Sequence, residues 1–312
     1  MKQILLLTFL ALGCQSASAI TVIENFGSGD NAFTMEFVTI GNPNNAADTT
    51  GNPNPAGSVA YAYNLGKYEV SRGQIDEANA VGSLGITMSD ITSYGGNGVN
   101  LPATGISWYE AARYVNWLNT STGGTAAYKF DGSGTFQLWS AGDAGYNANN
   151  LFRNSLAKFF LPSTDEWYKG AYGSPNGTWY NYPTESDSAP TAVASGTEAN
   201  TAVYGGQAGG PAGIADAGGL SAYGTMAQGG NAGELTETAY DGSNDIAWEN
   251  RERRGGSSNS NSSLLVASGR NFLDPSFEIS GLIGFRVASV PEPSTGLLVL
   301  LGLSGLLLKR RK

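Results

Sequence analysis

The sequence contains no histidine, and its single cysteine, Cys14, lies in an N-terminal segment that we expect to be removed on export. Without histidine there is no imidazole to act as a general base beside a serine or as a metal ligand. Without a cysteine in the exported part there is no disulfide, no thiolate ligand and no thiol nucleophile. These absences exclude thiol and imidazole chemistry from the exported part of the chain.

Basic residues are scarce as well, with 17 Lys and Arg against 26 Asp and Glu and a formal net charge of −9. The body carries only 12 basic against 25 acidic residues, or −13, once the terminal charges are set aside, namely Lys2, Glu292, Lys309, Arg310, Arg311 and Lys312. Nucleic acids and anionic membranes need a basic face, so neither is expected as a partner. The acidity is compatible with calcium binding and with simple solubility.

Glycine is abundant, with 44 residues in 312, about twice the usual share of roughly 7%. Twelve prolines add to this tendency, because both residue types interrupt regular elements. The length allows one large domain or two small ones. We therefore expect an α+β body that is rich in loops and has few short helices and strands.

The N-terminus has the features of an export signal. Lys2 supplies a positive start, residues 4–12 form an apolar run, and residues 17–19 read Ala-Ser-Ala, a small-residue cleavage pattern. We expect residues 1–19 to be a signal peptide and the mature chain to begin at Ile20. The alternative is that Cys14 becomes a lipidated residue.

The C-terminus has three parts within residues 290–312. Pro291, Glu292 and Pro293 precede an apolar run, and the chain ends with basic residues at 309–312. Residues 296–308 would form a helix about 20 Å long, against roughly 30 Å of hydrocarbon, so a permanent span is marginal. We expect a transient stop in the inner membrane, with the basic end in the cytoplasm.

This tail resembles the PEP-CTERM sorting signal of Gram-negative bacteria, which an exosortase processes. The resemblance implies delivery to the cell surface or the extracellular matrix. The alternative interpretation is an ordinary C-terminal anchor helix.

Local patterns predict several elements in the body. Apolar residues alternate over residues 33–39 and again over 59–70, so the two segments should be paired strands separated by a loop at 41–57. Three helices should begin with capping boxes, in which Ser is followed three residues later by Glu or Gln. The pairs are Ser71 and Gln74, Ser107 and Glu110, and Ser163 and Glu166. We therefore assign Glu110 and Glu166 to capping rather than to catalysis.

Six phrases in the body occur in the order found in one family. They are LGKYEVSRGQ at 65–74, ISWYEAARYVNWL at 106–118, FLPSTDEWYKG at 160–170, GGNAGE at 229–234, RGGS at 254–257 and GFRV at 284–287. In these phrases the chain resembles the formylglycine-generating enzyme domain, also called the sulfatase-modifying-factor domain. The resemblance covers nearly all of residues 20–289, and it implies a variant of the C-type lectin fold.

The departures from this family bear on activity. Catalytic members carry two cysteines shortly after RGGS, which bind copper and oxidise a substrate cysteine with oxygen. A gapless count places these positions at Ser260 and Leu265, so we expect no copper and assign no catalytic residue. An iron-dependent branch of the fold relies on histidine ligands, which are absent here. The chain is therefore uncertain as an enzyme and is interpreted as non-catalytic, and the alternative is a protein-modifying oxidase with an altered metal site.

Calcium is the metal that the resemblance implies. Asn231 and Glu234 match one calcium site of the family, and Asn200 and Asp216 are the candidates for a second. Calcium accepts carboxylate and carbonyl oxygens in irregular geometry, which suits a glycine-rich loop. The alternative is that Glu234 pairs only with an arginine, the candidates being Arg254, Arg270 and Arg286.

A binding surface remains after these exclusions. Asn259, Ser260 and Asn261 form a polar loop, and Tyr240 and Trp248 lie nearby in the sequence. Such polar and aromatic mixtures recognise sugars or proteins. The alternative is a solvated loop with Trp248 covering the core. We interpret the protein as an exported binding or structural module, with an exosortase and an extracellular polysaccharide or surface protein as partners.

Overall fold

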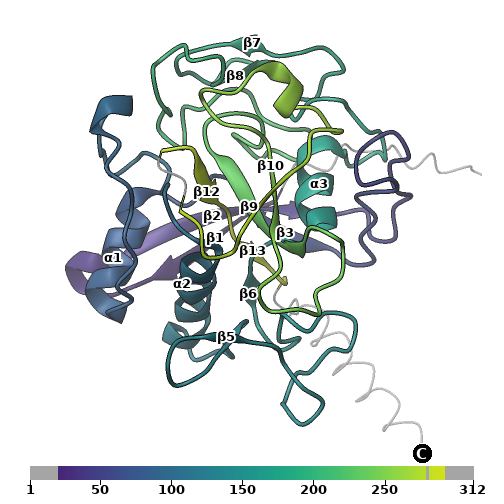
Figure 1. Cartoon of the computed structure of the whole chain (residues 1–312). Helices are drawn as coiled ribbons and strands as arrows, with labels where there is room; N and C mark the ends of the chain where they lie inside the picture. The colour runs from purple at the N-terminus through teal and green to yellow at the C-terminus, as the bar shows by residue number, and fades with distance from the viewer. Residues whose placement is uncertain (1–19, 279–280, 292–312) are drawn as a thin grey trace, which may run out of the picture.

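The computed structural model describes residues 20–278 and 281–291 (Figure 1). Two sheets lie at its centre, and long loops surround them. The first sheet has the order β1-β2-β3-β13-β6. Its strands are β1 (Thr21–Phe26), β2 (Phe33–Ile40), β3 (Tyr63–Gly66), β13 (Ala288–Ser289) and β6 (Phe159–Phe160). All neighbours in this sheet are antiparallel, and the sheet contains strands from both ends of the body, with β13 paired to β3 and β6.

The predicted pairing of segments 33–39 and 59–70 is confirmed, because β2 and β3 are antiparallel with Val38 opposite Leu65. The predicted alternation of apolar and polar positions fails at the end of β2. Val38 and Ile40 are buried at the end of β2, and Thr39 is half-buried. Thr39 instead donates a hydrogen bond to the side chain of Asn64, at 3.0 Å.

The second sheet has the order β11-β10-β9-β12. Its strands are β11 (Asn271–Leu273), β10 (Arg251–Arg254), β9 (Gly233–Ala239) and β12 (Ile283–Phe285). Strand β9 is antiparallel to β10 and parallel to β12. Two small ladders complete the strands, β4 (Lys129–Phe130) with β5 (Phe136–Gln137) and β7 (Thr191–Ala192) with β8 (Thr201–Ala202).

The described residues form three α-helices, α1 (Arg72–Gly82), α2 (Trp108–Ser121) and α3 (Thr164–Tyr172). Each has the predicted capping box, with Ser71, Ser107 and Ser163 as the N-caps. Short 3-10 turns occur at η1 (Gly29–Asn31), η2 (Thr92–Tyr94) and η3 (Ser262–Leu264). The expected loop-rich α+β class is confirmed.

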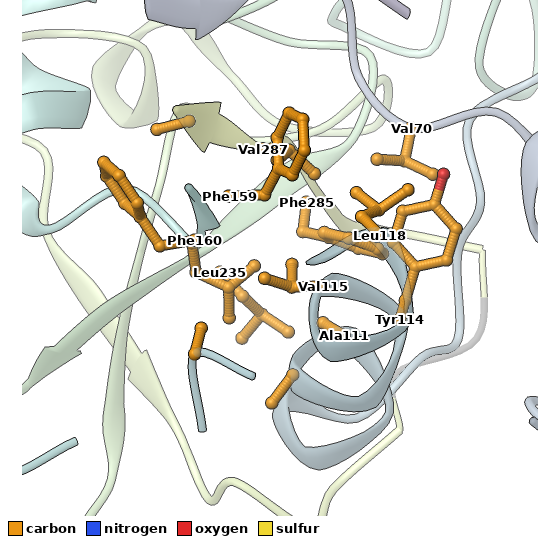
Figure 2. Packing of buried hydrophobic residues seen from close by; sticks show 14 of the residues in the cluster. Val70, Ala111, Tyr114, Val115, Leu118, Phe159, Phe160, Leu235, Phe285 and Val287 are labelled. Atoms are coloured by element: carbon orange, nitrogen blue, oxygen red, sulfur yellow. The ribbon is translucent and has the colours of Figure 1, made fainter. Parts of the chain in front are cut away.

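Helix α2 joins the two sheets. Its apolar face is fully buried and consists of Trp108, Ala111, Ala112, Val115 and Leu118. Tyr114 packs edge-on against Phe285 of the second sheet, with ring centroids 5.7 Å apart. The Tyr114 hydroxyl also donates to the sulfur of Met35 in the first sheet. Figure 2 shows this layer of apolar side chains between the helix and the strands.

Within the described ranges, none of the helices is both long enough and apolar enough to cross a bilayer. The predicted signal peptide and the apolar C-terminal run lie outside the described residues.

Leu118 provides a test of this packing. Its side chain is fully buried between α2 and the sheets, so Leu118→Ala should leave a cavity and cost about 2–5 kcal/mol of unfolding free energy. Leu156 is 61% exposed, and Leu156→Ala should change stability by about 0.5 kcal/mol or less. Urea unfolding of both variants measures the difference, and equal losses would contradict the packing.

Candidate functional site

Glu234, at the start of β9, is completely buried, and an arginine neutralises it. Its carboxylate accepts hydrogen bonds from Arg286 Nε at 2.6 Å and Arg286 Nη2 at 2.5 Å. Trp167 Nε1 of α3 donates a third bond at 2.6 Å. Arg286, also fully buried, donates further to the carbonyl oxygens of Gly66 and Met226, both at 2.8 Å. A bidentate pair of this kind is strongly directional.

Asn231 joins this pair to a second buried carboxylate. Its backbone has φ +55°, the left-handed region that asparagine tolerates. Asn231 Oδ1 accepts from the backbone N–H of Ala212, and its Nδ2 donates to Glu69. The backbone N–H of Ala232 also donates to Glu69, at 2.8 Å. Burial, and then the charge of Glu234, raises the pKa of Glu69 to about 8.

This geometry bears on the calcium prediction. Calcium needs six to eight oxygens with free lone pairs. Both oxygens of Glu234 accept N–H groups, and the guanidinium of Arg286 takes the position of a cation beside them. The donor set at Glu234 therefore does not fit calcium. Of the two interpretations of Glu234, the geometry favours pairing with an arginine, Arg286.

The second pair of calcium candidates lies in the loop layer of β7 and β8. Asn200 has φ +53°, and its Oδ1 accepts from the hydroxyl of Thr184 at 2.9 Å. Asp216 is exposed, and its backbone carbonyl accepts from Gly196. In the described ranges, no group of three or more Asp, Glu, His or Cys side chains could hold a metal. Calcium binding by this protein stays a prediction.

A cavity of about 150 Å³ lies beside β10 and the loop that follows it. The residues that line it are Gly233, Arg253, Arg254, Gly255, Gly256, Ser257, Ser260, Leu264, Gly269, Arg270, Asn271 and Leu282. A methyl group added at Gly256 would lie 3.1 Å from both Ser260 Cβ and Leu265 Cδ1. Ser260 and Leu265, the two positions given by the gapless count, therefore both lie against Gly256, but only Ser260 lines the cavity.

Two arginines at the cavity share one buried carboxylate. Glu252 accepts from Arg254 Nε at 2.5 Å and from Arg270 Nε at 2.6 Å. Arg254 also donates to the backbone carbonyls of Asn52 and Ala267. Arg254 and Arg286 therefore have structural roles, because each is buried and paired with a glutamate.

The predicted ligand-binding residues do not form one surface. Ser260 lines the cavity, whereas Asn259 and Asn261 are exposed beside it. The guanidinium carbon of Arg270 lies over the ring of Tyr240, 4.1 Å from the ring centroid. Trp248 precedes β10 and the loop follows it, so the two lie at opposite ends of that strand. Trp248 is 77% exposed and does not cover the core.

Sequence reasoning missed Glu69, and it overlooked Arg253 and Arg270 at the cavity. The available signal for the cavity was the run of four consecutive charged residues at 251–254, which reads Arg-Glu-Arg-Arg. Such a run within a buried strand must find partners or face a cavity, because an unpaired buried charge is costly.

The pKa of Glu69 predicts a pH dependence of stability. Between about 4.5 and about 8 the folded state holds a proton that the unfolded state releases, so unfolding free energy should fall as pH rises through this window. Glu69→Gln should flatten the slope by up to about 1.4 kcal/mol per pH unit. Urea midpoints across this range measure it. Asp76→Asn, at an exposed position of α1, is the control, and an unchanged slope in Glu69→Gln would contradict the assignment.

Comparisons with known proteins agree with this architecture. Residues 28–290 match the model of the sulfatase-modifying factor enzyme 1-like domain, and residues 289–312 match the PEP-CTERM protein-sorting motif. No curated protein is similar enough to be matched with this chain.

Several solved structures share the fold. Treponema denticola variable protein 1 superposes with a TM-score of 0.58 at 18% identity, over 86% of this chain and 99% of that chain. A protein described as CarF gives 0.60 at 18% identity, over 83% and 99%. PvdO from Pseudomonas aeruginosa gives 0.54 at 18% identity, over 86% and 98%.

The C-terminal motif implies export, cell-surface sorting in Gram-negative bacteria and processing by an exosortase. Because the first model covers most of the chain, the protein belongs to the sulfatase-modifying factor enzyme 1-like, or formylglycine-generating-enzyme-like, family and carries a PEP-CTERM sorting motif.

Proposed function

We propose that the protein is a non-catalytic member of this family that acts as a binding or structural module at the cell surface or in the extracellular matrix. The observation that carries the proposal is the chemistry of the cavity beside β10. Ser260, which lines the cavity, and Leu265, buried against Gly256, occupy the positions that the gapless count gives for the cysteines of the catalytic members. Copper(I) prefers soft sulfur ligands, and neither side chain supplies one.

The cavity also lacks the groups that would activate a serine. Ser260 Oγ accepts from the backbone N–H of Ser257 at 2.8 Å and lies 3.3 Å from the Ser257 hydroxyl. Among the described residues that line the cavity there is no Lys, His, Asp or Glu. A hydroxyl without an adjacent base is a weak nucleophile. The neighbouring arginines stay protonated and cannot act as that base.

A binding role is supported by polar and aromatic groups that the fold leaves accessible. Asn259 and Asn261 are exposed next to the cavity, and Trp248 is exposed at the other end of β10. Tyr240 packs against Phe272 in a tilted arrangement, with ring centroids 4.7 Å apart. We propose an extracellular polysaccharide or a surface protein as the partner. Transient anchoring in the inner membrane through the apolar C-terminal run, which lies outside the described residues, is part of the same proposal.

An oxidation assay distinguishes this proposal from a protein-modifying oxidase. The purified protein is incubated with a cysteine-containing sulfatase peptide, copper and oxygen, and the peptide is analysed by mass spectrometry. We expect the peptide mass to stay unchanged, because the chain offers no thiolate to hold copper(I). A Ser260→Cys/Leu265→Cys variant is the control, and it should compete for copper(I) with a chelator where the natural chain does not. A peptide oxidised by the natural chain would refute the proposal.

Processing of the tail is tested by intact-mass measurement of protein taken from cell envelopes. We expect a mass that lacks residues after the Pro-Glu-Pro motif, since exosortase processing follows from the sorting motif. A variant with alanine at Pro291, Glu292 and Pro293 should keep the full C-terminal mass. Recovery of the complete tail from the natural chain would contradict processing.

A further inference from the structure

Arg253 differs from every other arginine in the described part of the chain. The guanidinium groups of Arg72, Arg113, Arg153, Arg251, Arg254, Arg270 and Arg286 all make hydrogen bonds or ion pairs. Arg253 makes neither within residues 20–278 and 281–291, and its buried Nε has no hydrogen-bond partner. Burial lowers the pKa of Arg253. Arg253 as a whole is half-buried, but a buried N–H without an acceptor costs folding free energy, so its retention needs a reason outside the folding of the chain.

Arg253 lines the cavity beside β10, together with the hydroxyl-bearing Ser257 and Ser260 and the amide of Asn271. Its volume of about 150 Å³ matches that of cavities that hold a molecule the size of benzene. Such a cavity admits one small group of a ligand but not an extended chain.

The charge around the cavity is positive although the body carries −13. Arg253, Arg254 and Arg270 line the cavity, and among the residues that the structure describes Glu252 is the one carboxylate that pairs with any of them. Glu252 is already shared between Arg254 and Arg270, so the charge of Arg253 is not compensated. A guanidinium presents several donors in a planar fork that matches a carboxylate or sulfate.

We propose that the cavity binds one oxyanionic group, a carboxylate or a sulfate, carried by an acidic saccharide. This inference rests on the proposed binding function and names the chemical class of its ligand. The serine hydroxyls and Asn271 supply both donors and acceptors for sugar hydroxyls. Phe272, 46% exposed and packed at a tilt against Tyr240, offers an apolar face next to Arg270 for a sugar ring.

The charge of the whole body limits the size of the anionic ligand. A long polyanion such as a nucleic acid would be repelled by the surplus of acidic side chains. A single anionic group that enters the cavity while the rest of the saccharide stays outside avoids this repulsion. The cavity therefore suits a sugar with isolated charges rather than a densely charged polymer.

The experiment compares the purified protein with Arg253→Gln and with Arg113→Gln. Arg113 lies on α2, is partly exposed and pairs with Glu110 at 3.9 Å, so the second variant makes the same charge change away from the cavity. The ligands are sodium sulfate, a glucuronate-containing disaccharide, a sulfated disaccharide, a neutral disaccharide and a phosphopeptide. Titration calorimetry measures binding, and thermal unfolding without ligand measures stability.

We expect sulfate and at least one charged disaccharide to bind, and the neutral one to bind more weakly. Arg253→Gln should weaken this binding about tenfold or more, because a charge-assisted contact is lost, whereas Arg113→Gln should leave it within about twofold. Without ligand, Arg253→Gln should melt at the same temperature as the natural chain or higher. A purely structural arginine would instead lower the melting temperature when replaced.

Two results would overturn the inference without touching the proposed function. One is saccharide binding that Arg253→Gln leaves intact, which would place the ligand elsewhere on the protein. The other is preference for a phosphopeptide over every saccharide, which would assign the cavity to a protein partner. Absence of any anion binding by the natural chain would also refute the inference, whereas failure of the proposed function would appear as peptide oxidation.

Discussion

The fold depends on the buried ion pair between Glu234 and Arg286. Arg286 follows β12, Glu234 begins β9, and Arg286 reaches the carbonyls of Gly66 and Met226 in two other segments. Trp167 adds α3 to the same carboxylate. Removing either charge would leave the other buried and uncompensated, which is among the most destabilising changes in a protein interior. One pair thus fixes the relative positions of five segments that are distant in the sequence.

Other buried arginine–glutamate pairs connect parts of the chain that have little regular structure. Arg153 bridges Glu166 and Glu237, and Glu252 is shared by Arg254 and Arg270. In loops, backbone carbonyls have no ladder partners, and buried ones need donors. The guanidinium groups supply these donors while their charges are neutralised by glutamates. A glycine-rich body can therefore stay ordered with short strands and three described helices.

Features set by local sequence could be predicted, and features set by distant contacts could not. The capping boxes and the buried face of α2 follow from spacing within one helix. The partner of Glu234 lies 52 residues away, so the sequence left two interpretations of Glu234 open, calcium binding and pairing with one of three arginines.

Arg253 and Arg254 look alike in sequence, yet of these two only Arg254 reaches Glu252. A register shift between Arg251 and Arg253 breaks the strand alternation that would have separated their roles. Trp248 is near the Asn259 loop in sequence, but β10 separates them.

Arg253, which has no charge partner in the described part of the chain, also bears on the sign of charge that the cavity favours. A guanidinium held in a small cavity of low dielectric raises the cost of placing a cation beside it and lowers that of an anion. Ser260 lines this cavity and offers a hydroxyl where a soft metal would need sulfur. Arg253 has no charge partner among the described residues, so the positive charge at the cavity is not compensated. Both features favour an anionic group held by hydrogen bonds over a cation.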